Sequence, residues 1–201
     1  PHLVVPMVAG RDLIGVLSVE GETPVFSKEQ VQIAQEVAVQ IAVALTHTRL
    51  VERIAQQQAF LRQVIDLDRN LIFAKDREGR FTLANQALAE VYGTTPKDLI
   101  GKSDHDFNPN REEVERFRRD DLDVMDSLNE KFVPEERITD ASGRVRWLQT
   151  VKRPMMDAQG RVDMLLGVSS DITQRKRGEA ALVRAHKMAK LAHVITGSQG
   201  V

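Results

Sequence analysis

The side chains best suited to catalysis or metal binding are few and scattered in this sequence. Its 201 residues include no cysteine, which excludes disulfide bonds, thiolate metal sites, cysteine nucleophiles and chromophores linked through cysteine. Five histidines occur, and no two of them have the four-residue spacing that places a metal pair on one helix face. We therefore expect no bound metal and no cofactor.

Carboxylates are concentrated in one segment, residues 104–136, which holds 12 acidic and 5 basic residues, a net charge of −7. A calcium-binding loop needs alternating oxygen ligands and a glycine in its middle, and this segment has no glycine. We interpret these charges as the solvated face of a helix.

Overall charge and hydropathy point away from two classes of partner. Lys and Arg number 28 and Asp and Glu 29, so the net charge is −1, which gives no support to nucleic-acid binding. The longest apolar stretch, Val37–Leu45, is interrupted by Gln40 and is far shorter than the ~20 residues of a membrane span. We expect no membrane contact and a cytoplasmic location. The chain opens on a strand-like run without a basic leader, which we interpret as part of a longer protein.

The first third of the sequence predicts a hairpin followed by a long helix. Two apolar, β-branched runs at 3–8 and 13–19 are joined by a turn containing Gly10. Ser27 and Gln30 have the spacing of a capping box, which predicts a helix over about 27–66. Its apolar positions recur at helical spacing: Ala34, Ala38, Ile41, Leu45, Leu50, Ile54, Leu61 and Val64. Because a helix this long usually packs against a copy of itself, we expect a homodimer through the long helices.

The rest of the sequence predicts an α+β domain with an antiparallel sheet. Five strand-like runs are expected, and short helices, a helix over 111–128 and a final helix with Asp171 as N-cap and Gln174 at the capping-box position accompany them. The expected strands lie at 71–74, 81–84, 131–139, 145–153 and 162–169. Trp147, the single tryptophan, falls in the fourth run, and alternation alone leaves open which face of the sheet it occupies.

Short motifs in the order of this second region resemble those of a PAS domain, the sensory module of bacterial signalling proteins. They are Phe81–Ala87, Tyr92-Gly93, Leu99–Lys102, Ser103–Phe107, Gly143–Trp147, Lys152–Pro154, Asp157–Gly160 and Asp171-Ile172-Thr173 followed by Arg175-Lys176. The opening is similar to the last third of a GAF domain, through Val5-Pro6-Met7, Ile14–Leu17 and the helix that holds Ala34 to Leu50.

The resemblance implies four segments. They are the C-terminal part of a GAF-like domain (1–50), a helical linker (51–65), a PAS domain (66–176) and an exit helix that connects to an absent module (177–201). The implied PAS fold is a five-stranded antiparallel sheet with short helices on one face, flanked by long signalling helices.

The resemblance also implies a ligand pocket and a signal-coupling segment. The pocket candidates are Phe73, Leu83, Asn85, Val91, Phe107, Phe117 and Leu166. For Asn85 a local capping role is the favoured alternative to a ligand contact. The helix over 111–128 has no histidine where a haem-binding PAS domain would place its ligand, so we expect no haem. Asp171 and Thr173 are expected to couple the last strand to the exit helix.

The function predicted from the sequence is that of a sensory and relay fragment without catalysis of its own, with a sensor histidine kinase as the expected parent. Its expected partners are a second copy of the chain, a small-molecule ligand and the absent output domain. Two alternatives stay open: a dimerisation or spacer module with a filled core, and the sensory part of a cyclic-dinucleotide cyclase.

Overall fold

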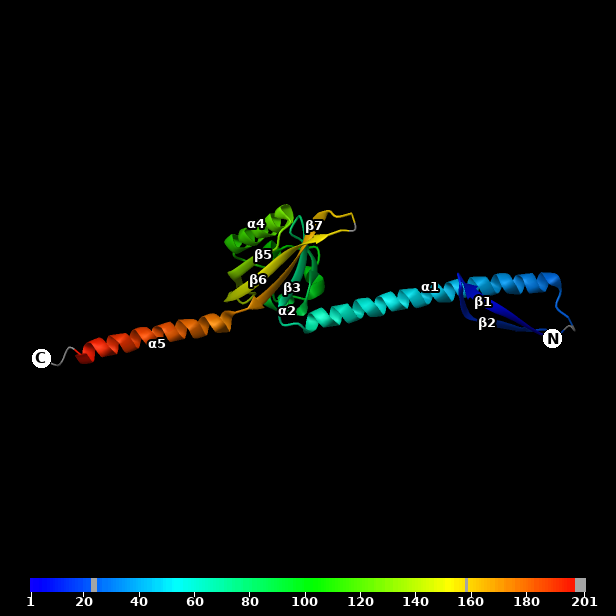
Figure 1. Ribbon diagram of the computed structural model, residues 1–201, viewed down its shortest axis with the longest axis horizontal. Helices are drawn as coiled ribbons and strands as arrows, with labels where there is room; N and C mark the ends of the chain where they lie inside the picture. Colours follow the sequence, from blue (N-terminus) through cyan, green and yellow to red (C-terminus); the bar gives the residue numbers. More distant parts are fainter. Residues whose placement is uncertain (23–24, 158, 198–201) are drawn as a thin grey trace. The chain divides into compact units, whose positions relative to one another are not determined.

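The computed structural model describes residues 1–22, 25–157 and 159–197, with side chains up to residue 188. The chain divides into two compact units, Pro1–Leu61 and Arg62–Val201, most of whose elements are labelled in Figure 1.

The first unit is a hairpin covered by the beginning of a long helix. Strands β1 (His2–Ala9) and β2 (Asp12–Glu20) pair antiparallel around Gly10, whose φ of 65° suits glycine in the tight turn. Helix α1 (Lys28–Leu67) follows the predicted capping box, in which the Ser27 N–H donates to Gln30 (2.8 Å) and the Gln30 N–H donates to Ser27 (3.2 Å).

Small residues form the buried face of α1 in this unit. Ala34, Ala38 and Ala42 are buried, and the first two pack with Val5 of β1 in a small core. Leu45, which the sequence placed on the same apolar face, is 39% exposed. The buried stripe is therefore narrower than the apolar pattern of the helix.

The second unit is built on a five-stranded antiparallel sheet of order β4-β3-β7-β6-β5. Its strands are β3 (Leu71–Asp76), β4 (Phe81–Ala84), β5 (Lys131–Thr139), β6 (Val145–Met156) and β7 (Val162–Asp171). The predicted α+β class and antiparallel sheet are confirmed. β7 is longer than predicted because its pairing with β6 continues to Asp171, opposite Leu148.

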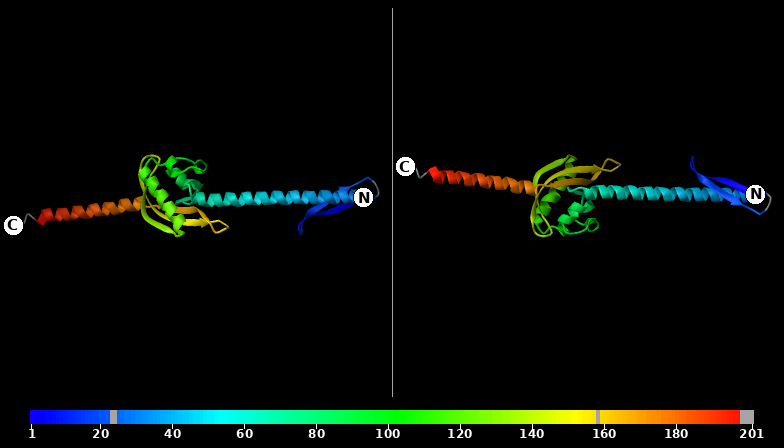
Figure 2. Two further views of the ribbon diagram at one scale, coloured as in Figure 1. Left: turned by 90° about the horizontal axis from the view of Figure 1, so that it is seen from above. Right: turned by 90° about the horizontal axis from the view of Figure 1, so that it is seen from below.

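The helices of this unit pack on one face of the sheet (Figure 2). They are α2 (Gln86–Val91), α3 (Pro96–Leu99), the 3-10 turn η1 (Asp104–Asp106) and α4 (Arg111–Ser127). The core between sheet and helices includes Phe81, Leu99, Val124, Met125 and Leu165, all nearly inaccessible to solvent. Alternation along β6 turns Leu148, Thr150 and Lys152 toward this core and Trp147 toward the opposite face.

Helix α5 (Thr173–Gly197) follows β7 directly. The prediction of Asp171 as its N-cap is wrong, because Asp171 is the last residue of β7 and Ile172 separates it from the helix. The Asp171 carboxylate instead accepts from the Thr173 N–H (2.8 Å), two residues on. In the described part of the chain, no helix is long and apolar enough to cross a membrane.

Candidate ligand-binding cavity

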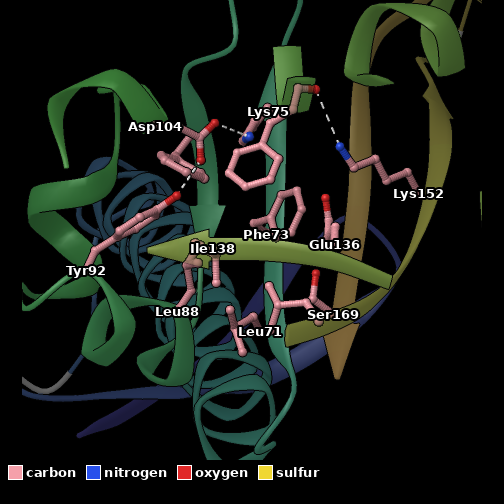
Figure 3. Close-up of a pocket in the computed structure, with 13 residues that line it drawn as sticks. Leu71, Phe73, Lys75, Leu88, Tyr92, Asp104, Glu136, Ile138, Lys152 and Ser169 are labelled. Atoms are coloured by element: carbon pink, nitrogen blue, oxygen red, sulfur yellow. Dashed lines mark hydrogen bonds and ion pairs between the residues drawn. The ribbon is translucent and has the colours of Figure 1, made fainter. Parts of the chain in front are cut away.

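A small cavity lies between the sheet and the helices of the second unit (Figure 3). Its volume is about 20 Å³, enough for roughly one water molecule. All five strands, β3 to β7, contribute to the wall, and α2 with its C-cap, η1 and α4 complete it. The lining residues are Leu71, Phe73, Lys75, Phe81, Leu88, Tyr92, Asp104, Phe117, Glu136, Ile138, Leu148, Lys152 and Ser169.

Aromatic rings fill one side of the cavity. Phe73 meets Phe81 edge to face, with ring centroids 6.3 Å apart, and Phe81 lies 6.3 Å from Tyr92. Such contacts add to the free energy of apolar burial and hold the rings in defined positions. The Lys75 ammonium lies 5.0 Å from the Phe73 centroid and 4.9 Å from the Phe81 centroid, so the rings also face a cation.

Two lysines and two aspartates form a buried ion-pair network beside these rings. Lys75 pairs with Asp104 and with Asp121 (3.1 Å), while Lys152 pairs with the second oxygen of Asp121 (2.6 Å). The Tyr92 hydroxyl donates to Asp104 (2.7 Å). β3, β6, α2, η1 and α4 each contribute one member, so the network joins the sheet to three helical segments.

The network shifts the pKa values of its members. Burial alone would lower the pKa of Lys75, but the charges of Asp104 and Asp121 outweigh it and raise that pKa. Burial alone would raise the pKa of Asp121, and Lys75 and Lys152 reverse the direction and hold it below its ordinary value. Burial raises the pKa of Tyr92, and the Asp104 charge adds to the effect. At neutral pH Lys75 and Asp121 are charged and the phenol of Tyr92 is neutral.

A second polar group crosses three neighbouring strands. Ser169 of β7 and Thr150 of β6 have hydroxyl oxygens 2.8 Å apart, and the Thr150 hydroxyl donates to Oε1 of Glu136 on β5. Because Thr150 uses its only proton on Glu136, Ser169 must donate to Thr150. The carboxylate of Glu136 therefore ends a chain of hydroxyl donors.

The predicted pocket residues separate into two groups. Phe73 and Phe117 line the cavity, and Phe107 lies behind its wall with its ring stacked on Tyr92 (5.6 Å). Three others lie outside the lining: Leu83, Val91 and Leu166. Leu166 is on the outer face of β7 because the core-facing positions of that strand are Leu165, Gly167 and Ser169.

Asn85 also lies outside the cavity, and its side chain is used by backbone groups. Its Oδ1 accepts from the N–H groups of Ile72 (3.0 Å) and Leu88 (3.2 Å), the second of which is a helix cap. Its amide donates to the carbonyls of Ile65 (2.9 Å) and Asn70 (2.8 Å). This fully buried residue thereby ties the end of α1 to β3 and α2.

Sequence reasoning missed the polar part of the cavity. Lys75, Tyr92, Asp104, Glu136, Lys152 and Ser169 line it and were not among the candidates. A signal was present for two of them. Lys75 continues the inward alternation of Leu71 and Phe73, and Lys152 continues that of Leu148 and Thr150.

The predicted coupling residues lie where β6, β7 and α5 meet. The Trp147 N–H donates to the Thr173 hydroxyl oxygen (2.9 Å), and the Ile172 N–H donates to the Trp147 carbonyl (2.8 Å). Asp171 lies 3.5 Å from Arg146 and accepts from the Thr173 N–H. The Lys176 ammonium lies 5.1 Å from the Trp147 ring centroid. The start of α5 is therefore held by β6, and the ion pair of Lys176 with Glu135 (2.8 Å) adds a contact to β5.

Among the described residues, no group of three or more histidine, aspartate and glutamate side chains is placed to hold a metal ion. The cavity combines an aromatic wall, an ion-pair network and a carboxylate that accepts a hydroxyl donor.

The fold and this cavity define a PAS-type sensory domain, and comparison with known families agrees. The family model described as PAS fold matches residues 65–177, more than half of the chain, so the chain belongs to the PAS-fold family. A second model, described as GAF domain, matches residues 1–45. The PAS resemblance seen in the sequence is confirmed.

Similar proteins include signalling proteins of two output classes. The methanogenesis regulatory histidine kinase FilI of Methanothrix harundinacea is 26% identical over 137 residues, which are 68% of this chain and 15% of FilI. A diguanylate cyclase of Vibrio cholerae is 35% identical over 111 residues, 51% of this chain and 32% of the cyclase. The chain thus spans a third or less of the length of these relatives.

The fold is also similar to that of a solved PAS domain. The PAS domain of BvgS from Bordetella pertussis is 26% identical, with a TM-score of 0.50, and the match covers 68% of this chain and 98% of that structure.

Proposed function

We propose that this chain is a sensory and relay segment of a signalling protein, in which a small molecule binds in the PAS cavity and alters the start of α5. Leu148 and Ser169 face inward and line the cavity. Their near neighbours in sequence, Trp147 and Asp171, both form hydrogen bonds with Thr173, the first residue of α5. That adjacency is the observation that carries the proposal. Leu148 lines the cavity, and the adjacent residue of β6, Trp147, bonds Thr173 at the start of α5.

The energetic requirement is modest. A ligand shifts a two-state element only by its differential affinity for the two states, typically ~1–3 kcal/mol. The hydrogen bond between Trp147 and Thr173 is of this order. Loss or formation of this one contact is therefore enough to bias the position of α5.

The proposed organisation follows the predicted segments: 1–50 GAF-like, 51–65 linker, 66–176 PAS and 177–201 connector. The similarity to FilI supports a sensor histidine kinase as the parent, and the similarity to the diguanylate cyclase supports the alternative output. In either parent the segment itself relays and does not catalyse, and it acts in the cytoplasm.

The competing function is that of a dimerisation or spacer module with a filled core. The cavity volume of about 20 Å³ favours this alternative, because no organic ligand fits without movement of the lining. The buried polar groups favour the sensory function, because a core that served packing alone would gain stability from apolar residues at these positions.

The experiment that separates the two functions is hydrogen exchange on the purified chain with and without a metabolite mixture extracted from bacterial cells. We expect slower exchange at Thr150 and Ser169 and altered exchange at residues 174–182. Unchanged exchange throughout the PAS unit, with no small molecule retained in native mass spectrometry, would favour the spacer function.

A further inference from the structure

The Oε2 atom of Glu136 is one of the few buried polar atoms of this domain that have no hydrogen-bond partner among the described residues. Glu136 is 5% exposed and lines the cavity, and its Oε1 accepts from Thr150. Its Oε2 is fully buried and has no hydrogen-bond partner in the described part of the chain. A buried carboxylate oxygen without a partner costs free energy, so its retention calls for a donor that the protein itself does not supply.

A β-bulge in β5 turns this carboxylate toward the cavity. Pairing with β6 shifts register between Val133 and Glu136, where Pro134 and Glu135 lie opposite a single residue of β6. Without that bulge, alternation from Val133 would turn Glu135 inward and leave Glu136 in solvent. Bulges of this kind re-aim a side chain beside a site, and proline is tolerated because β5 is an edge strand.

Glu136 forms no ion pair with any described residue, although cations lie near the cavity. Lys75 and Lys152 are both engaged by Asp104 and Asp121, so the network is neutral by itself. Glu113, also buried, is bonded by Asn108 (3.0 Å) and by the Thr139 N–H (2.7 Å), neither of which carries a charge. The unpaired carboxylate of Glu136 is therefore the group in the lining that a positively charged ligand would satisfy. Figure 3 shows Glu136, Lys152 and Ser169 rising from neighbouring strands on one face of the sheet.

We propose that the ligand of this cavity is a small organic cation, a primary ammonium or an amidinium with a short apolar body, which donates to Glu136 Oε2. This inference rests on the proposed function, since it assumes that the cavity receives a ligand. The donor pairs with the carboxylate of Glu136, and the apolar body lies against the rings of Phe73, Phe81 and Phe117. An anionic ligand would meet Glu136 with like charge and is disfavoured.

The small volume sets the size of the ligand. At about 20 Å³ the cavity admits one water, so even a four-atom ligand must displace lining side chains. Leu148 and Ser169 are among the lining residues and lie close in sequence to Trp147 and Asp171, which contact Thr173 of α5. Size and charge thus both connect binding to the relay.

The test uses three probes of nearly equal shape: n-propylammonium, 1-propanol and propionate. Each is titrated into the 15N-labelled chain while the amide signals of Thr150, Gly167 and Ser169 are followed by NMR. We expect propylammonium to bind most tightly and propionate least. Glu136→Gln removes the charge at nearly constant shape and is expected to weaken propylammonium binding at least about tenfold without affecting propanol. Glu112→Gln, at an exposed position of α4, is the matched control and is expected to bind like the wild type.

Each outcome is decisive. Equal or stronger binding of propanol or propionate by the wild type would contradict the cationic nature of the ligand, while still showing that the cavity binds a ligand. Equal loss of propylammonium and propanol in Glu136→Gln would show a distorted cavity, and the wild-type ranking would then decide. No binding of any probe would mean that the cavity holds water only and would overturn this inference, whereas the metabolite experiment would still decide the sensory function.

Discussion

The first residue of α5 is bonded to the strand beside the cavity: the Thr173 hydroxyl oxygen accepts the backbone N–H of Trp147 at 2.9 Å. Thr173 is 9% exposed, so this bond is shielded from water. Thr173→Val keeps the shape and removes the acceptor, leaving the Trp147 N–H unpaired at a cost of about 1–3 kcal/mol. We expect hydrogen exchange over residues 174–182 to accelerate about fivefold or more, with the core strands unchanged.

Thr82→Val, at an exposed position of β4, is the matched control and is expected to leave exchange in α5 as in the wild type. Unchanged protection of α5 in Thr173→Val would remove this bond from the relay.

Asp121 serves two lysines at once, and its loss is expected to be costly. Asp121→Asn leaves Lys152 buried without its carboxylate partner and weakens the hold on Lys75. Removal of one member of a buried ion pair typically costs about 3–5 kcal/mol. Urea unfolding followed by the fluorescence of Trp147, the only tryptophan, measures the loss in this unit. Asp123→Asn, on the exposed side of the same helix, is expected to cost less than about 1 kcal/mol; equal losses in the two variants would contradict the role of the network.

The shifted pKa values predict how stability depends on pH. The pKa of Asp121 is held below its ordinary value, and so is that of Asp140, where four donors from Ser142, Arg144 and Arg146 outweigh the effect of burial. Their contribution is present above the unfolded-state pKa of about 3.9 and is lost as the pH falls through the folded values. The pKa of Lys75 is raised, so its contribution is present below about pH 10.4 and is lost as the pH rises through its folded value.

We therefore expect the free energy of urea unfolding to change little between about pH 5 and about pH 9 and to fall on both sides. Asp140→Asn is expected to lower stability at neutral pH and to flatten the acid limb. Asp163→Asn, at an exposed position of β7, is the control. A wild-type stability that does not fall below about pH 4 would contradict these shifts.

Local signals in the sequence explain why much of the fold was predictable. Ser27 and Gln30 define the start of α1 through contacts three residues apart, and the strand patterns depend on neighbours in sequence. The cavity was harder because its network joins residues from five elements, so no local pattern contains it. The inward turn of Glu136 depends on the register shift in β5, which Pro134 hints at but does not define. For Leu166, an error of one position was enough to choose the outer face.

Gly167 leaves room for an aromatic ring of the cavity wall. It pairs across strands with Phe73, and a Cβ added at this position would overlap the Phe73 ring. Gly167→Ala therefore forces the ring to move, toward the cavity or with the strand, at a cost of about 1–3 kcal/mol. We expect lower stability in urea and weaker binding of the small probes. Gly178→Ala, where an added Cβ meets no neighbouring atom, is the matched control and is expected to lose neither stability nor binding. Unchanged stability and binding in Gly167→Ala would show that the Phe73 ring can adopt another position without cost.

The exposed apolar residues of α1 predict self-association. From Val43 onward, positions at alternating steps of four and three residues form a coiled-coil repeat, and all of them except His47 and Gln57 are apolar: Val43, His47, Leu50, Ile54, Gln57, Leu61 and Val64. Ile54 and Leu61 are 54% and 62% exposed in the single chain, so a second copy of the helix would bury them. Each buried leucine or isoleucine contributes about 1.5–3 kcal/mol, and an aspartate at the same position adds a charge that the seam would have to desolvate. We therefore expect the wild type to sediment as a dimer and the double variant Ile54→Asp, Leu61→Asp as a monomer.

Gln56→Asp, outside the seam on the same helix, introduces the same residue and is expected to remain dimeric. A wild-type chain that sediments as a monomer at high concentration would contradict the seam, and a double variant that stays dimeric would place the contact elsewhere.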